Sequence, residues 1–132
     1  MPIRDMSKNL SLAQSIDPQT ISSNTTTNGT GVDVRDYDAV VVSFESNDAV
    51  ADGIYVLGVE ESDDNSTFTD VASADLIGTV ANFTASSEGI RWQGYIGIKR
   101  YIRASIVSTS TSSGGIMGAC VIRGLPHSAP TS

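Results

Sequence analysis

The sequence predicts an all-β fold: a single antiparallel β-sandwich, of the jelly-roll or immunoglobulin-like kind, with an extended N-terminal arm and a C-terminal tail. Apolar residues make up 39% of the 132 residues and occur in short runs rich in valine and isoleucine, which favour strands. Turn-forming residues separate these runs at intervals of roughly ten residues, which is typical of sandwiches and barrels. A chain of 132 residues has room for one hydrophobic core.

Residues 1–31 are predicted to form the extended arm. Asp17-Pro18 favours a turn or an extended break, and residues 22–31 contain no apolar side chain. Apolar residues nearby could form one or two short strands: Leu10, Leu12, Ile16 and Ile21. Two interpretations of the arm stay open, a loose terminal segment or a segment that becomes ordered against a neighbouring subunit.

The sandwich domain is predicted to span residues 32–124. In its first half, segments 39–44, 54–59 and 67–71 are expected to form a meander of antiparallel strands. The acidic segment 60–66 is interpreted as a solvated turn between the second and third of them. A helical turn at 72–76 and an edge strand at 78–83 are expected to follow.

The second half of the domain predicts three more strands. Segment 90–95 alternates, with Ile90, Trp92 and Gly94 on one face, and segment 101–107 turns Ile102, Ala104 and Ile106 to one side. After a polar loop at 108–115, residues 116–123 form the last core strand. Ile96 and Ile98, which lie between the first two strands, are also expected to serve the core. Residues 125–132 contain two prolines and are predicted to form an extended tail.

Charge is segregated along the chain. The formal net charge is −7, yet residues 89–132 contain five basic residues and no acidic ones. Two interpretations stay open: the cations pair with carboxylates of the same sandwich, or they form a basic patch for an acidic partner. We favour carboxylates of this domain or of a neighbouring subunit as partners of Lys99, Arg100 and Arg103. The acidic total argues against binding to nucleic acid.

Motifs for catalysis or for cofactors are missing from the sequence, so no enzymatic activity, cofactor or metal is expected. The one histidine, His127, lies in the tail between prolines, where a catalytic triad could not hold it rigidly. The one cysteine, Cys120, is interpreted as a buried structural thiol. No apolar run approaches the length of a membrane span, and the N-terminus lacks the apolar segment of a signal peptide, so no membrane partner is expected.

A series of short motifs runs through residues 30–130. It consists of Val32-Asp33-Val34, Tyr37-Asp38, Glu61-Ser62-Asp63-Asp64, Phe68-Thr69-Asp70-Val71, Leu76-Ile77-Gly78, Gly94-Tyr95-Ile96-Gly97, Lys99-Arg100-Tyr101-Ile102-Arg103 and Gly124-Leu125-Pro126-His127. In these motifs the chain resembles the capsid decoration, or cement, proteins that tailed phages encode beside the major capsid protein.

The resemblance implies a β-sandwich without enzymatic activity that binds the outer surface of an icosahedral capsid. Such a protein stabilises contacts between subunits of the major capsid protein and forms homotrimers or dimers. It is therefore expected on the outside of the virion, with the major capsid protein and copies of itself as partners.

The resemblance assigns no contact residues, so the candidate interface is inferred from the termini and from the basic segment. It comprises Ile3, Arg4, Leu10, Leu12, Lys99, Arg100, Tyr101, Arg103, Pro126 and His127. The alternative function is a carbohydrate-binding sandwich associated with a phage tail or fibre. That alternative requires an exposed aromatic platform, for which Trp92, Tyr95 and Tyr101 are the candidates.

Overall fold

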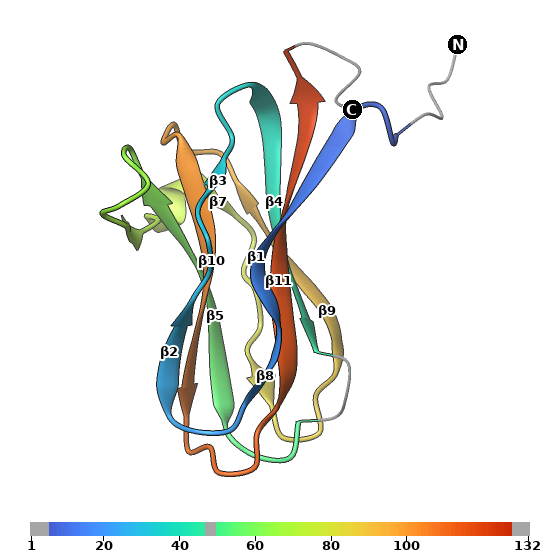
Figure 1. The fold of residues 1–132 in the computed structure, drawn as a ribbon, viewed down its shortest axis with the longest axis vertical. Helices are drawn as coiled ribbons and strands as arrows, with labels where there is room; N and C mark the ends of the chain where they lie inside the picture. Colours follow the sequence, from blue (N-terminus) through green and yellow to red (C-terminus); the bar gives the residue numbers. More distant parts are fainter. Residues whose placement is uncertain (1–5, 47–49, 128–132) are drawn as a thin grey trace.

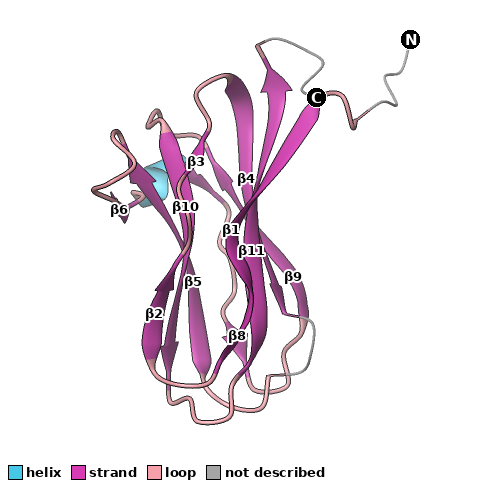
Figure 2. Cartoon of the chain, viewed as in Figure 1, coloured by secondary structure: helices cyan, strands magenta, loops and turns pink. Residues whose placement is uncertain are grey.

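The structure of the chain, a computed structural model that describes residues 6–46 and 50–127, is an antiparallel β-sandwich (Figure 1). Its elements in chain order are β1 (Leu10–Ile21), β2 (Thr25–Asn28), β3 (Val32–Asp33), β4 (Tyr37–Ser46), β5 (Ile54–Ser62), β6 (Thr69–Asp70), the 3-10 turn η1 (Ser73–Asp75), β7 (Leu76–Ile77), β8 (Phe83–Thr84), β9 (Gly89–Tyr95), β10 (Tyr101–Thr109) and β11 (Gly115–Pro126). Strands dominate the described residues (Figure 2), which confirms the predicted fold class.

Two sheets form the layers of the sandwich. Sheet A has the strand order β1-β11-β4-β9-β7, and sheet B has the order β2-β10-β5-β6, with β3 also paired to β10 and β8 to β5. The predicted meander was wrong at its first connection, because β4 and β5 lie in different sheets. Both strands bury one face, and that pattern fits neighbours in one sheet as well as partners in opposite sheets. Only the connection from β5 to β6 joins antiparallel neighbours as expected.

The core lies between the two sheets and follows the alternation of the strands. Val42 and Phe44 of β4, Tyr55 of β5, and Ile102 and Ile106 of β10 are all 0% exposed. Each such side chain stabilises the fold by roughly 1.5–3 kcal/mol through removal of apolar surface from water. The predicted inward positions of β10 are therefore confirmed.

Residues 10–28 belong to the sandwich, which corrects the predicted arm at 1–31. Strand β1 pairs with β11 from Leu10 opposite Gly124 to Ile21 opposite Gly115, and β2 pairs with β10. The break expected at Asp17-Pro18 is a register shift between Ile16 and Gln19. An edge strand tolerates proline at such an irregularity, so the proline does not end the strand.

The C-terminal boundary of the sandwich lies beyond the predicted residue 124, because β11 continues to Pro126, which pairs with Tyr37. The edge strand expected at 78–83 is replaced by the short strands β7 and β8 on either side. The rest of the predicted tail, 128–132, and the start of the arm, with its candidate contacts Ile3 and Arg4, lie outside the described residues. Among the residues that are described, no helix is long and apolar enough to cross a membrane.

Candidate functional site

One end of the sandwich gathers most of the predicted interface residues. Strands β1, β4 and β10 begin there, and β5, β9 and β11 end there (Figure 1). The register places Leu10 beside Gly124, Pro126 beside Tyr37, and Tyr101 beside Ser62. We call this end, together with loop 96–100, the Lys99 end. The structure thus brings together segments that are about 90 residues apart in the sequence, from Leu10 to Lys99.

Loop 96–100 presents two apolar side chains to solvent. Ile96 is 58% exposed and Ile98 is 96% exposed, so the expectation that they serve the core was wrong. Strand β9 ends at Tyr95, and beyond that residue the alternation of a strand no longer directs side chains inward. Gly97, which lies between them, was the signal in the sequence that the strand ends here. The structure gives the reason for this glycine, since a Cβ at position 97 would overlap the Tyr95 ring.

The same loop is fastened to the sandwich by specific hydrogen bonds. The Tyr95 hydroxyl donates to Glu61 Oε1 at 2.9 Å and accepts from the backbone N–H of Lys99 at 3.0 Å. The backbone N–H of Ile96 donates to the carbonyl of Asp75 at 2.8 Å. Burial and the neighbouring Glu61 raise the pKa of Tyr95 above its ordinary value, so the hydroxyl stays protonated and able to donate. The exposed isoleucines are therefore held on a fixed loop.

Lys99 and Arg100 pair with carboxylates of the acidic half of the chain. Lys99 Nζ lies 2.7 Å from Asp63 Oδ2, and Arg100 Nη2 lies 2.8 Å from Asp33 Oδ2. The hydrogen bond from Arg100 holds the pKa of Asp33 below its ordinary value. That from Lys99 to Asp63 raises the pKa of Lys99. Of the two interpretations of the charge segregation, pairing inside the sandwich is thus confirmed for these cations.

Arg103 is more enclosed than the other two cations. Its Nε lies 2.6 Å from Glu60 Oε1, and the side chains are 20% and 17% exposed. The guanidinium carbon also lies 4.1 Å from the centroid of the Phe68 ring. Tyr101, by contrast, remains half-buried beneath Arg100, whose guanidinium carbon is 5.0 Å from its ring centroid. Arg103 therefore stabilises sheet B, whereas Lys99 and Arg100 lie at the rim of the candidate site.

The end of β11 adds Pro126 and His127 to the same end of the molecule. The backbone N–H of His127 donates to the carbonyl of Asp36 at 2.8 Å, and its Nε2 lies 2.8 Å from Asp38 Oδ1. The groove beside loop 96–100 measures about 540 Å³ and is lined in part by Arg35, Asp38 and Ile98. Asp38, the partner of His127, thus lines the same groove as the exposed loop.

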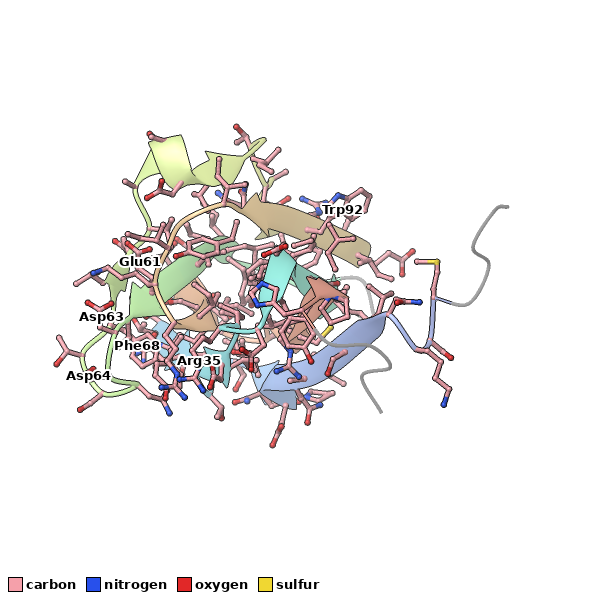
Figure 3. All side chains as sticks on the ribbon, turned by 90° about the horizontal axis from the view of Figure 1, so that it is seen from above. Arg35, Glu61, Asp63, Asp64, Phe68 and Trp92 are labelled. Atoms are coloured by element: carbon pink, nitrogen blue, oxygen red, sulfur yellow. The ribbon has the colours of Figure 1, made fainter. Side chains whose placement is uncertain are left out.

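Leu10 and Leu12 point away from the core, on the outer face of sheet A. Leu10 lies over Gly124, and Leu12 is 62% exposed. Trp92 of β9 is on this outer face too and is 66% exposed. Figure 3 shows Trp92 well apart from the labelled cluster of Glu61, Asp63, Asp64, Phe68 and Arg35.

In the acidic turn 60–66, the carboxylate of Asp64 orders the turn itself. Asp64 Oδ1 accepts hydrogen bonds from the backbone N–H groups of Ser66 and Thr67 and from the Ser62 hydroxyl, each at 2.9 Å. These bonds hold the pKa of Asp64 below its ordinary value. In the part of the chain that the structure describes, no three His, Cys, Asp or Glu residues are grouped to hold a metal ion.

Comparison with known proteins identifies the fold. No protein-family model matches the chain, and no curated protein matches its sequence. The SPBc2 prophage-derived protein YomS is 13% identical, with a TM-score of 0.51 over 86% of this chain and 93% of YomS. The PBSX exported protein XepA is 19% identical, with a TM-score of 0.58 over 93% of this chain but only 39% of XepA. The chain therefore shares its sandwich fold with YomS and with part of XepA.

Proposed function

We propose that this chain is a structural virion protein that binds the outer surface of a tailed-phage capsid. In this role it stabilises contacts between subunits of the major capsid protein, as a cement or decoration protein, and catalyses no reaction. The fold shared with a prophage-derived protein supports a phage origin. The motifs between residues 30 and 130 that resemble decoration proteins support the specific role.

The exposed and fixed loop at the Lys99 end is the observation that carries the proposal. Ile98 is 96% exposed, although the backbone of the loop is bonded to Asp75 and to the Tyr95 hydroxyl. Because the loop is already ordered, little conformational entropy is lost when a partner covers it. Apolar side chains surrounded by paired charges match the general anatomy of a protein interface, with an apolar centre and a polar rim.

A protein surface fits this end better than a nucleic acid does. Lys99, Arg100 and Arg103 each pair with a carboxylate of the same domain, so their charge is neutralised locally. Nucleic-acid binding needs cations that can displace the counterions of phosphates. The net charge of −7 adds long-range repulsion from any polyanion.

The alternative of a carbohydrate-binding module is less well supported. It requires Trp92, Tyr95 and Tyr101 to share one aromatic platform. The structure buries Tyr95 in the core at 4% exposure and places Tyr101 on sheet B, away from Trp92 of sheet A. Trp92 has aliphatic neighbours instead, namely Ile90 and Ile77. Sugar rings stack on aromatic faces, so this arrangement favours a different partner.

The proposal is tested with capsids that lack this protein, prepared from the phage that encodes it. Purified protein is added, and the bound copies per capsid are counted by quantitative mass spectrometry after sedimentation. We expect saturable binding with a copy number set by the capsid symmetry. The double variant Ile96→Ser with Ile98→Ser should reduce apparent affinity at least about tenfold, since two exposed apolar anchors are lost.

A matched control comes from the opposite end of the sandwich. Ile54 and Val56 of β5 are 43% and 45% exposed, and the double variant Ile54→Ser with Val56→Ser also replaces two exposed apolar side chains, far from loop 96–100. This variant should bind capsids as the original protein does. Equal binding by the double loop variant, or binding that does not saturate, would contradict the proposal.

A further inference from the structure

The outer face of sheet A carries a continuous apolar row across all five of its strands. The register aligns the members of this row directly: Leu12 opposite Ile122, Ile122 opposite Val41, Val41 opposite Gly94, and Gly94 opposite Ile77. Adjacent side chains in such a row have Cβ atoms about 4.5–5.5 Å apart, and the Ile77 side chain lies against Gly94, which has none, so the row forms one surface. The sheet therefore has an apolar stripe on the side that faces away from the core.

Neighbouring outward positions widen this stripe into a patch. Ser43 is opposite Trp92, and Glu45 is opposite Ile90, on the next two rows. Four large apolar side chains of the patch are more than half exposed: Leu12 at 62%, Ile77 at 59%, Ile90 at 58% and Trp92 at 66%. Isolated apolar side chains on a surface are ordinary, but a contiguous patch on a monomer marks a contact site. We call this surface the sheet A patch.

The outer face of sheet B differs in composition. Arg103 and Glu60 pair across it, and the threonines of β2 lie at its edge. Its exposed apolar residues are Ile54, Val56 and Val107, at 43%, 45% and 38%. This face therefore offers a smaller apolar surface next to a charge pair.

We propose that the sheet A patch is a self-association surface, on which a second copy of this chain packs sheet against sheet. Among the outward positions of the aligned rows, from Leu12 to Glu45, the charged residue is Glu45, on the central strand β4 in the last row. Two molecules with a net charge of −7 repel each other, so they approach best through a face that is nearly free of charge. An uncharged apolar face is complementary to itself across a two-fold axis, whereas it offers a charged partner nothing to pair with.

The area of the patch sets the expected strength of the contact. With strands about 4.8 Å apart and outward rows about 6.8 Å apart, three rows on β11, β4 and β9, two on β1 and one on the two-residue β7 cover roughly 400 Å². Two copies would bury about 800 Å² in total, below the size of a stable specific interface. A weak dimer is the expected result, with a dissociation constant of about 10 µM or higher.

The orientation of the patch also favours a second copy, on an argument that rests on the proposed function. The strands run from the Lys99 end to the opposite end (Figure 1). If the Lys99 end contacts the capsid, the sheet A patch faces sideways, towards copies bound at neighbouring positions. Weak pairwise contacts between copies held on one surface then act at high effective concentration.

Trp92 makes this interface directly measurable, because it is the one tryptophan of the chain. Its fluorescence emission is recorded on the full chain in solution, without capsids, from about 1 to 500 µM, alongside sedimentation velocity. We expect a blue shift of the emission with rising concentration, in parallel with conversion of monomer to dimer. Leu12→Lys and Ile77→Lys, which place charge in the apolar row, should each raise the dissociation constant at least about tenfold.

The matched control is Val56→Lys, at a half-exposed position on sheet B. It adds the same charge and should leave the dimer unchanged, and thermal unfolding of all variants verifies that each is folded. A protein that stays monomeric with unshifted emission, or a dimer lost equally in Val56→Lys, would overturn the proposal. A blue shift that requires added capsids would also overturn it, since the capsid protein would then cover the patch. Because the dimer itself is measured without capsids, its result is separate from that of the proposed capsid binding.

Discussion

Arg103 and Glu60 stand directly opposite each other on neighbouring strands of sheet B, with Arg103 Nε 2.6 Å from Glu60 Oε1. Both side chains are about four-fifths buried, and the Phe68 ring covers the guanidinium. Removal of one partner would leave the other charge partly buried and without its hydrogen bond. Arg103→Ala should therefore lower the free energy of unfolding by about 2–3 kcal/mol, measured by urea denaturation.

Arg100→Ala is the matched comparison for this effect. Its pair with Asp33 has both side chains 39% exposed, where water screens the charges. Loss of this pair should cost less than about 1 kcal/mol. If Arg100→Ala destabilises the protein as much as Arg103→Ala does, burial does not decide the strength of these pairs.

Asp52 controls a second, pH-dependent contribution to stability at the end opposite to Lys99. Its carboxylate accepts hydrogen bonds from the Ser112 hydroxyl at 2.6 Å and from backbone N–H groups of Ser112, Ser113 and Gly114. These bonds, that from the Ser112 side chain above all, lower the pKa of Asp52 far below its ordinary value. The β10–β11 loop is thus bonded to an ionised carboxylate.

A lowered pKa in the folded state fixes the sign of the pH effect. The stabilisation by Asp52 is complete above the unfolded-state pKa of about 3.9 and is lost as pH falls towards the lowered folded-state pKa. Thermal melting between about pH 5 and pH 2 should show a steeper loss of stability for the original protein than for Asp52→Asn. Glu88→Gln, which removes an exposed carboxylate before β9, serves as the control for net charge. Identical pH profiles for the original protein and Asp52→Asn would refute the role of Asp52.

Tyr95 is expected to matter for the rigidity of loop 96–100 more than for the fold. Tyr95→Phe keeps the buried ring but removes the hydroxyl that joins Glu61 to the Lys99 amide. The cost in stability should be about 1 kcal/mol. Hydrogen exchange at the Lys99 amide, measured by NMR, should become faster while amides of β4 and β11 remain protected. An unchanged exchange rate at Lys99 would mean that the loop is held by other contacts.

The core strands and their buried faces could be predicted from the sequence because alternation is a local property. Ile102, Ala104 and Ile106 are all 0% exposed, as their spacing indicated. The pairing of C-terminal cations with N-terminal carboxylates also followed from charge segregation, since residues 89–132 hold no acid. Which carboxylate each cation would meet depends on how β3 and β5 pair with β10, and no single segment encodes that pairing.

Which face of each strand meets the core could not be predicted in the same way. Ile90, Trp92 and Gly94 were placed together on one face of their strand, and they do share a face. Alternation identifies two faces but not which of them meets the core, and the tryptophan lies on the outer face with 66% exposure. For the same reason the sheet A patch depends on five strands that are distant in sequence.

The role of the N-terminal segment changes most between sequence and structure. From the sequence, deletion of residues 1–20 is expected to weaken capsid binding without unfolding the domain. The structure makes residues 10–21 an edge strand of sheet A, with Ile16 and Ile21 only 2% and 3% exposed. Deletion of residues 1–20 removes all of β1 except Ile21 and would leave β11 as a new unpaired edge, a site for aggregation.

Deletion of residues 1–20 should therefore unfold the protein or render it insoluble. The buried Ile16 contributes about 1.5–3 kcal/mol, and its loss comes together with that of the backbone ladder between β1 and β11. The total stability of a domain is only about 5–15 kcal/mol, so this loss consumes much of it. Deletion of residues 1–6 is the control and should melt as the full chain does, because β1 remains whole. Circular dichroism and thermal melting of both truncations test this prediction. A folded, soluble 1–20 deletion would show that sheet A is stable without β1 and that this segment is an arm, as the sequence indicated.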